Sequence, residues 1–228
     1  ARARRYLTIG GGLWLALLVY VVAAGKPPLD VYGHVIGGDF AAHFIGGRFA
    51  LRGEWSQLYD LAAQARAQVQ EIPGAPANFH DAYISPPAAA LIYAPFARLP
   101  FLGAYAAWVA FSVLLTVASG WLIGPLLPRW LYESRTARLS LFLSAPFVET
   151  CYAGQDAAVS LFLFAAGLRM LHARWDLLAG LVLGLGAYKP QLFMLVPVPR
   201  PARRRLAAWA GMGVSGCAVL SLSVALVG

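Results

Sequence analysis

The sequence predicts an all-α, polytopic transmembrane protein. Sixty per cent of its 228 residues are hydrophobic, only 12% are charged, and the mean hydropathy is +0.64. The surface of a water-soluble domain does not tolerate such a composition. Three uncharged stretches are each long enough to cross a hydrocarbon core of about 30 Å as a helix, namely 6–24, 99–128 and 206–228. We therefore expect a single transmembrane domain over residues 1–228.

The first stretch, 6–24, follows Arg2, Arg4 and Arg5. It could be read as a signal peptide, but its apolar run is longer than the usual hydrophobic region of about 7 to 15 residues, so we favour a retained anchor. Because the chain starts without Met and stops within an apolar stretch, we interpret it as an N-terminal fragment of a longer chain.

The basic residues predict which side of the membrane each loop faces. Twelve of the eighteen Lys and Arg residues lie in four clusters, which the positive-inside rule makes cytoplasmic: 2–5, 129–138, 169–174 and 200–205. The segment 25–85 carries six of the ten acidic residues and should form an extracytoplasmic loop. We expect a multi-pass protein of the plasma (inner) membrane with a cytoplasmic N-terminus. Because the net charge of +8 is explained by topology, we expect no nucleic-acid partner.

Several apolar pieces between the long spans are too short to cross the membrane unaided. They are 10 to 12 residues long and flank polar breaks at 149–156 and at Lys189; the pieces are 86–97, 139–148, 157–168, 177–188 and 190–199. Broken helices are tolerated at membrane depth where the freed backbone is buried in protein or lines a wet cavity. We expect an outward-facing cavity with five polar residues near its walls: Asp39, Glu149, Gln155, Asp156 and Lys189.

The loop 25–85 should itself contain amphipathic helices. Residues 40–51 place aromatic side chains on one face and Arg48 on the other, which is typical of an interfacial helix. Ser56 is expected to cap a second helix over 57–69. The segment 73–78 predicts a turn or loop.

Asp39 is the leading candidate for a functional side chain. A carboxylate close to a bilayer costs desolvation energy unless it is paired or used. Its place after Gly37-Gly38 suits a helix N-cap, a general base, or both. Lys189 interrupts an apolar segment and precedes Pro190; it could bind a phosphate or snorkel to the interface. A base and a phosphate-binding cation suffice for glycosyl transfer from a lipid phosphate, because a phosphate leaving group needs no second carboxylic acid.

The motifs over about 25–205 together resemble glycosyltransferase family 87 (GT87), a GT-C group that includes polyprenol-phosphate-mannose-dependent mannosyltransferases. The motifs are Gly37-Gly38-Asp39-Phe40, Leu58-Tyr59-Asp60, Tyr83-Ile84-Ser85-Pro86-Pro87, Gly154-Gln155, and Gly180 to Gly186 leading into Lys189-Pro190. Asp156 departs from similar sequences, which often carry an amide or small polar residue after the Gln. No family role is therefore copied onto Asp156.

The resemblance implies a membrane enzyme whose first outer loop supplies the catalytic Asp, here Asp39. It also implies transfer of a hexose, with mannose expected, from a polyprenyl-phosphate sugar to a glycolipid or glycan acceptor in the cell envelope, with inversion. The lipid-linked sugar phosphate is a donor substrate, and we expect no cofactor. We expect no metal either, because one outer Asp without a neighbouring acidic partner is a poor divalent site.

The other polar residues have structural interpretations beside the functional ones. Gln155 could contact sugar or phosphate or serve as an ordinary hydrogen-bonding amide, and Arg48 could face lipid headgroups or recognise lipid phosphate. Tyr83 is a candidate for substrate binding, although Tyr83 and Tyr59 are most simply interfacial aromatics. The remaining interpretations are structural: Glu149 and Asp156 as ion pairs with cations on later helices, and His43 and His80 as interfacial or loop histidines.

Two other classes of function remain open at this point. Broken helices with ionisable residues also build the solute sites of transporters, although no internal repeat is apparent in this chain. A non-catalytic membrane subunit of a glycan-assembly complex is the third possibility. Solute flux without a covalent product would favour the transporter, and activity of the purified single chain would argue against the subunit.

Overall fold

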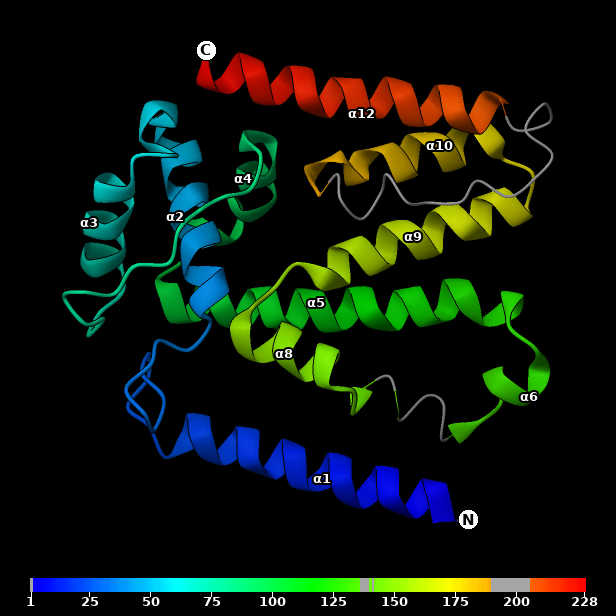
Figure 1. The fold of residues 1–228 in the computed structure, drawn as a ribbon, viewed down its shortest axis with the longest axis horizontal. Helices are drawn as coiled ribbons and strands as arrows, with labels where there is room; N and C mark the ends of the chain where they lie inside the picture. Colours follow the sequence, from blue (N-terminus) through cyan, green and yellow to red (C-terminus); the bar gives the residue numbers. More distant parts are fainter. Residues whose placement is uncertain (1, 136–139, 141, 190–205) are drawn as a thin grey trace.

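The computed structural model describes residues 2–135, 140, 142–189 and 206–228. All the regular elements of this part of the chain are helices, and β-pairing within it is limited to isolated bridges near Lys26, Leu29 and Val35. Helices α1, α5, α9, α10 and α12 run alongside one another, and the shorter α2, α3 and α4 gather at one end of them (Figure 1). The predicted all-α class is confirmed.

Among the described residues, two helical segments are long and apolar enough to cross a membrane. The first is Phe101–Leu126, which joins α5 (Phe101–Ile123) to a 3-10 turn (Gly124–Leu126), and the second is α12 (Leu206–Val227). Shorter apolar helices accompany them at Thr8–Ala23 within α1 (Arg2–Ala23), in α9 (Ala157–His172), and in α10 (Asp176–Gly184) with its 3-10 extension to Tyr188.

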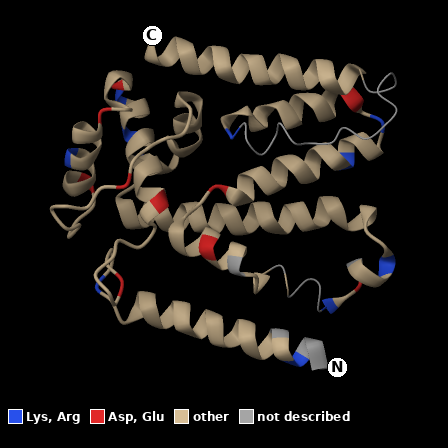
Figure 2. Cartoon of the chain, viewed as in Figure 1, with Lys and Arg blue, Asp and Glu red and all other residues tan. Residues whose placement is uncertain are grey.

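Charged residues concentrate at the two ends of these long helices. The short α6 (Arg129–Tyr132) and the turn between α9 and α10 lie at the end that holds the N-terminus, and both carry basic residues (Figures 1 and 2). The segment that contains α2 to α4 lies at the opposite end. This separation agrees with the sidedness predicted from the described basic residues, while the absolute orientation stays a prediction. The predicted cluster 200–205 and part of 129–138 lie outside the described residues.

Helix α2 (Gly38–Arg52) forms the centre of the main hydrophobic core. Phe40, Phe44 and Ile45 are completely buried and pack with Trp108 of α5 and residues of α4 (Pro87–Tyr93). The predicted helix at 40–51 is confirmed, but its interpretation as an interfacial helix is wrong. Its apolar face is covered by protein, which the alternation of residues along a single helix could not reveal.

The second helix of this segment begins later than predicted. A 3-10 turn occupies Trp55–Gln57, and α3 (Leu61–Glu71) is capped by Asp60, whose carboxylate accepts from the amides of Ala62 and Ala63. Ser56 is therefore not the cap. The helix predicted at 86–97 begins as expected, because α4 has a proline in its first turn, where a missing amide hydrogen costs nothing. It is shorter than predicted: α4 ends at Tyr93, and a 3-10 turn follows at Phe96–Arg98.

Helix α3 holds the loop that precedes α4 through two glutamines. Gln68 Nε2 donates to the Asp81 carbonyl at 2.6 Å, and the Asp81 amide donates to Gln68 Oε1 at 2.9 Å. Gln64 Oε1 similarly accepts from the Tyr83 amide at 2.8 Å, and its Nε2 donates to the Leu58 carbonyl at 2.6 Å. Both glutamines are buried. They fix the extended segment around Asp81 and Tyr83 as a strand partner would.

The break predicted at 149–156 is real but narrower than expected. Helix α8 (Ala145–Ala153) continues through Glu149, so only Gly154, Gln155 and Asp156 separate it from α9. The predicted piece 177–188 is confirmed as α10 and its 3-10 extension. The predicted piece 190–199 lies outside the described residues, and so does part of 139–148.

Candidate functional site

A cavity of about 490 Å³ lies where α2, the loop before α4 and the segment after α10 meet. Its walls carry five polar side chains: Asp39 and His43 from α2, Asp81 and Ser85 from the loop, and Lys189. Tyr188 and several small or apolar residues complete the lining. Asp39 and Lys189, which are far apart in the sequence, thus line the same cavity.

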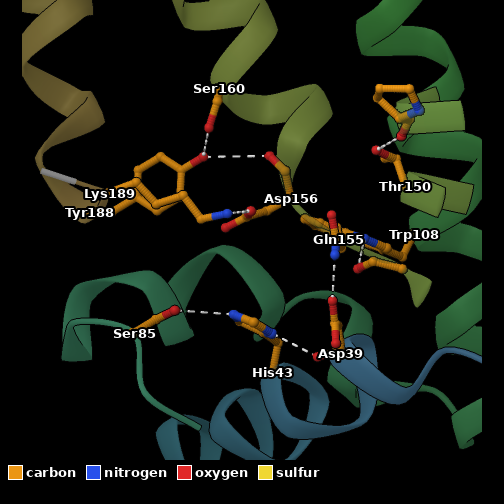
Figure 3. Close-up of polar contacts among 12 residues, drawn as sticks. Asp39, His43, Ser85, Trp108, Thr150, Gln155, Asp156, Ser160, Tyr188 and Lys189 are labelled. Carbon is orange, nitrogen blue, oxygen red and sulfur yellow. Dashed lines mark hydrogen bonds and ion pairs between the residues drawn. The ribbon is translucent and has the colours of Figure 1, made fainter. Parts of the chain in front are cut away.

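Asp39 lies in the first turn of α2 and points away from the helix. The N-cap is Gly37 in a left-handed conformation, with φ at 72°, and no side chain caps this helix. The interpretation of Asp39 as an N-cap is therefore wrong. Its Oδ2 atom instead accepts a hydrogen bond of 2.7 Å from Gln155 Nε2 (Figure 3). The negative charge is also well placed beside the positive end of the helix dipole.

Gln155 is positioned by a turn that α5 supports. Helix α8 ends at Ala153, and its C-cap is Gly154, whose φ of 72° suits a residue without a Cβ. The Trp108 indole donates to the Gly154 carbonyl at 2.8 Å, and the Tyr105 hydroxyl donates to the Cys151 carbonyl at 2.6 Å. Carbonyls at the end of a helix need such partners where water is excluded. These contacts leave the Gln155 side chain directed toward Asp39.

Lys189, which follows α10, is paired with Asp156 in the break between α8 and α9 (Figure 3). Asp156 is only 2% exposed, and within the described residues its second carboxylate oxygen has no hydrogen-bond partner. The predicted ion pair of Asp156 is confirmed, but its cation is Lys189 rather than a Lys or Arg from a helix outside this sequence. Because an ammonium group has three donors, Lys189 keeps hydrogen-bonding capacity for a ligand in the cavity.

His43 lies on the cavity wall one helical turn after Asp39. Its Nδ1 atom is 2.7 Å from the Asp39 carbonyl oxygen, and its Nε2 atom is 3.1 Å from Ser85 Oγ. Burial lowers the pKa of His43. The interpretation as an interfacial histidine is wrong. The spacing of four residues from Asp39 on a predicted helix was the sequence signal that could have placed both residues on one face.

Asp81 brings a second carboxyl group to the cavity. Burial raises its pKa, and the negative charge of Asp39 raises it further. The sequence places Asp81 in the outer segment without indicating that it lies near Asp39, because the contact depends on how α3 holds the loop. Among the described residues, no three His, Cys, Asp or Glu side chains are grouped so that they could hold a metal ion.

Five of the predicted polar residues are not part of the cavity lining. Gln155 and Asp156 are linked to it through their contacts with Asp39 and Lys189, and the other three lie elsewhere. Glu149 is exposed and belongs to a separate groove beside α1. Arg48 donates to the Leu99 carbonyl at 3.2 Å and pairs with Glu71 at 3.5 Å. Tyr83 is buried behind His43, with the ring centroids 5.5 Å apart, and its hydroxyl donates to the Pro86 carbonyl. The interpretation of Tyr83 as an interfacial aromatic is therefore wrong.

Comparison with known families identifies the family of the chain. The model of glycosyltransferase family 87 matches residues 83–228, which is more than half of the chain. The chain belongs to glycosyltransferase family 87. The GT87 match includes Ser85, Gln155, Asp156 and Lys189, whereas Asp39 and His43 precede it. No curated protein and no solved structure matches the chain.

Membership of GT87 confirms the family predicted from the motifs. With the two long apolar helices, it indicates a membrane glycosyltransferase. The cavity brings a carboxylate, an ammonium group and hydroxyl groups together along its walls. Pockets of about 300 to 1,000 Å³ commonly hold small-molecule ligands, so a volume of about 490 Å³ is sufficient for a sugar and its phosphate.

Proposed function

We propose that this GT87 protein transfers a hexose, mannose in the first instance, from a polyprenyl phosphate to an extracytoplasmic lipid or glycan acceptor. The observation that carries the proposal is the placement of the Asp39 carboxylate and the Lys189 ammonium on the walls of one cavity. The two apolar helices of membrane-spanning length among the described residues suit a lipid-linked donor. Neither a cofactor nor a metal ion is part of the proposed mechanism.

The proposed reaction is a single displacement at the anomeric carbon. The acceptor oxygen forms a bond to that carbon while the bond to the phosphate oxygen breaks, and the phosphate leaves with the electron pair. Asp39 takes the proton of the acceptor hydroxyl as general base. Lys189 uses its remaining N–H groups to stabilise the departing phosphate. Attack from the face opposite the leaving group inverts the anomeric centre.

The test is sugar transfer by the purified protein in proteoliposomes. The expected result is that label from a polyprenyl-phosphate [14C]mannose appears in the acceptor, and that NMR of the product shows the anomeric configuration opposite to that of the donor. Retention of configuration would contradict the single displacement. Transfer from a nucleotide sugar, but from no polyprenyl-phosphate hexose, would contradict the donor class.

A further inference from the structure

We propose that His43 holds the hydroxyl of Ser85 as a hydrogen-bond acceptor toward the cavity, so that Ser85 selects a sugar hydroxyl that donates to it. Both residues line the cavity, and neither is among the residues that carry out the displacement proposed above. The inference rests on the proposed function, from which the sugar is taken. Ser85 is the specificity-determining residue, and His43 is the positioning residue that acts through it.

The tautomer of His43 follows from its two partners. A backbone carbonyl can only accept, so the Nδ1 atom, 2.7 Å from the Asp39 carbonyl oxygen, carries a hydrogen. In a neutral imidazole the other nitrogen is then an acceptor. The hydrogen between Nε2 and Ser85 Oγ, 3.1 Å apart, therefore belongs to Ser85.

The orientation of the Ser85 hydroxyl determines what it can bind. A hydroxyl has one hydrogen and two lone pairs, and the hydrogen of Ser85 is engaged by His43. Only lone pairs are left for the cavity. A sugar hydroxyl can donate to them, whereas an ionised phosphate oxygen cannot. Ser85 and Lys189 thus discriminate between the two parts of the donor, because the first accepts hydrogen bonds and the second donates them.

The surroundings of His43 keep the ring neutral. Its centroid lies 4.5 Å from that of Tyr93 and 5.5 Å from that of Tyr83, so two aromatic side chains pack against the ring. Burial is the largest influence and lowers its pKa. The charged and titratable groups that face it are Asp39 on its own helix, Asp81 on the loop, Asp156 before α9, Lys189 after α10, Tyr83 and Tyr93.

Protonation of His43 would reverse the polarity of Ser85. The imidazolium has two N–H donors, so Nε2 would donate to Ser85 Oγ and release the Ser85 hydrogen toward the cavity. Of the neighbouring charges, those of Asp156 and Asp39 favour this protonation and that of Lys189 opposes it. Ser85 should therefore prefer a sugar hydroxyl that donates a hydrogen bond at neutral pH, and this preference should weaken at acidic pH.

The tautomer can be measured without any turnover. The full chain in lipid nanodiscs would be labelled with [15N]histidine, and His43→Asn would identify the His43 signals among the four histidines. At pH 7 we expect Nδ1 to be protonated and Nε2 to be bare. A protonated Nε2, either in the other neutral tautomer or in an imidazolium, would overturn the proposal.

Selection by Ser85 is tested with deoxy sugars. Wild type and Ser85→Ala would be compared on a polyprenyl-phosphate mannose and its monodeoxy analogues, and on octyl mannoside and its monodeoxy analogues as acceptors. We expect one deoxy analogue to lower the kcat/KM of wild type by about 10-fold or more, and that of Ser85→Ala by no more than about 2-fold. If the analogue belongs to the polyprenyl-phosphate mannose series, Ser85 binds a hydroxyl of the donor; if it belongs to the octyl mannoside series, Ser85 binds a hydroxyl of the acceptor.

Two further variants separate selection from folding. His43→Asn keeps a donor near the Asp39 carbonyl but is too short to reach Ser85, so it should lose the preference. Tyr59→Phe removes the hydroxyl that donates to the Ser85 main-chain carbonyl at 2.8 Å. This variant should keep the preference for the complete sugar over its deoxy analogue. If wild type transfers no sugar, the proposed function fails. The preference is then measured as binding affinity, by titrating the labelled protein with octyl mannoside and its deoxy analogues and following the His43 chemical shifts.

If wild type and Ser85→Ala show the same preference for the complete sugar, by kcat/KM or by binding affinity, the inference is overturned.

Discussion

Gln155 donates a hydrogen bond of 2.7 Å to the Asp39 carboxylate across 116 residues of sequence. The contact joins the first turn of α2 to the break between α8 and α9. It occupies one carboxylate oxygen with a neutral donor. The carboxylate is thereby oriented at the cavity wall without being neutralised by a cation.

Replacement of Gln155 should therefore affect catalysis more than folding. We expect Gln155→Ala to lower kcat by about 10-fold or more, because a hydrogen bond to a charged group is worth about 1.5 to 3 kcal/mol. Gln155→Glu has nearly the same shape but places a second negative charge beside Asp39, so it should lose more activity than Gln155→Ala. The measurement is kcat against pH with a saturating donor. Wild-type activity in Gln155→Glu would show that the contact is irrelevant to the reaction.

The ion pair of Lys189 and Asp156 allows structural and chemical roles to be separated. Lys189→Met leaves a buried carboxylate without its cation and should lower the free energy of unfolding by about 3 kcal/mol. Lys189→Met combined with Asp156→Asn should regain most of that stability but not sugar transfer. The measurements are thermal unfolding in detergent and the transfer assay. A double variant that transfers sugar at the wild-type rate would reduce Lys189 to a structural role.

Gly154 should be the least replaceable glycine of the site. Its φ of 72° disfavours any other residue, and a Cβ added there would lie 2.5 Å from the Phe40 Cβ in the core. We expect Gly154→Ala to cost about 3 kcal/mol of folding free energy, from backbone strain and overpacking together. Gly33→Ala is the matched control, because Gly33 has a φ of 82° with no atom near the added Cβ. It should cost only about 1 kcal/mol.

Asp81 should make the protein less stable as the pH rises. Its pKa is raised in the folded state, so the folded protein keeps a proton that the unfolded chain has released above about pH 3.9. The free energy of unfolding then falls between that pH and the raised pKa. Asp81→Asn should gain stability relative to wild type over this window, as measured by unfolding temperatures from pH 4 to pH 7. The same pH dependence of the unfolding temperature in wild type and Asp81→Asn would contradict the prediction. Glu133→Gln is the control, because Glu133 is exposed and lies at the opposite end of the long helices.

The sequence predicted the elements of this protein better than their packing. Composition and run length predicted the helical class and the segment Phe101–Leu126, and the Pro-Pro pair predicted the start of α4. The helical pattern of α2 was recognised, but not that protein covers its apolar face. An amphipathic helix has the same pattern whether lipid or protein covers it, so only tertiary contacts distinguish the two.

The candidate site shows the same division. Asp39, Gln155 and Lys189 stood out because polar residues in apolar surroundings are costly, and the structure brings all three to the cavity or its rim. Asp81 and His43 did not stand out, because they lie in a segment where polar residues are ordinary. The position of Asp81 depends on the hydrogen bonds that Gln68 makes to its backbone, and that of His43 on the packing of α2 against α4. Neither contact can be recognised from the local sequence.

The central claim is that Asp39 accepts the proton of the sugar acceptor, and the most direct test is Asp39→Asn. An asparagine at this position can still accept the hydrogen bond from Gln155, so the fold should be kept while the base is lost. We predict that kcat/KM for transfer from a polyprenyl-phosphate mannose falls by at least about 100-fold, with an unchanged unfolding temperature. Glu149→Gln, an exposed carboxylate outside the cavity, should keep its activity. Undiminished transfer by a folded Asp39→Asn protein would contradict the account.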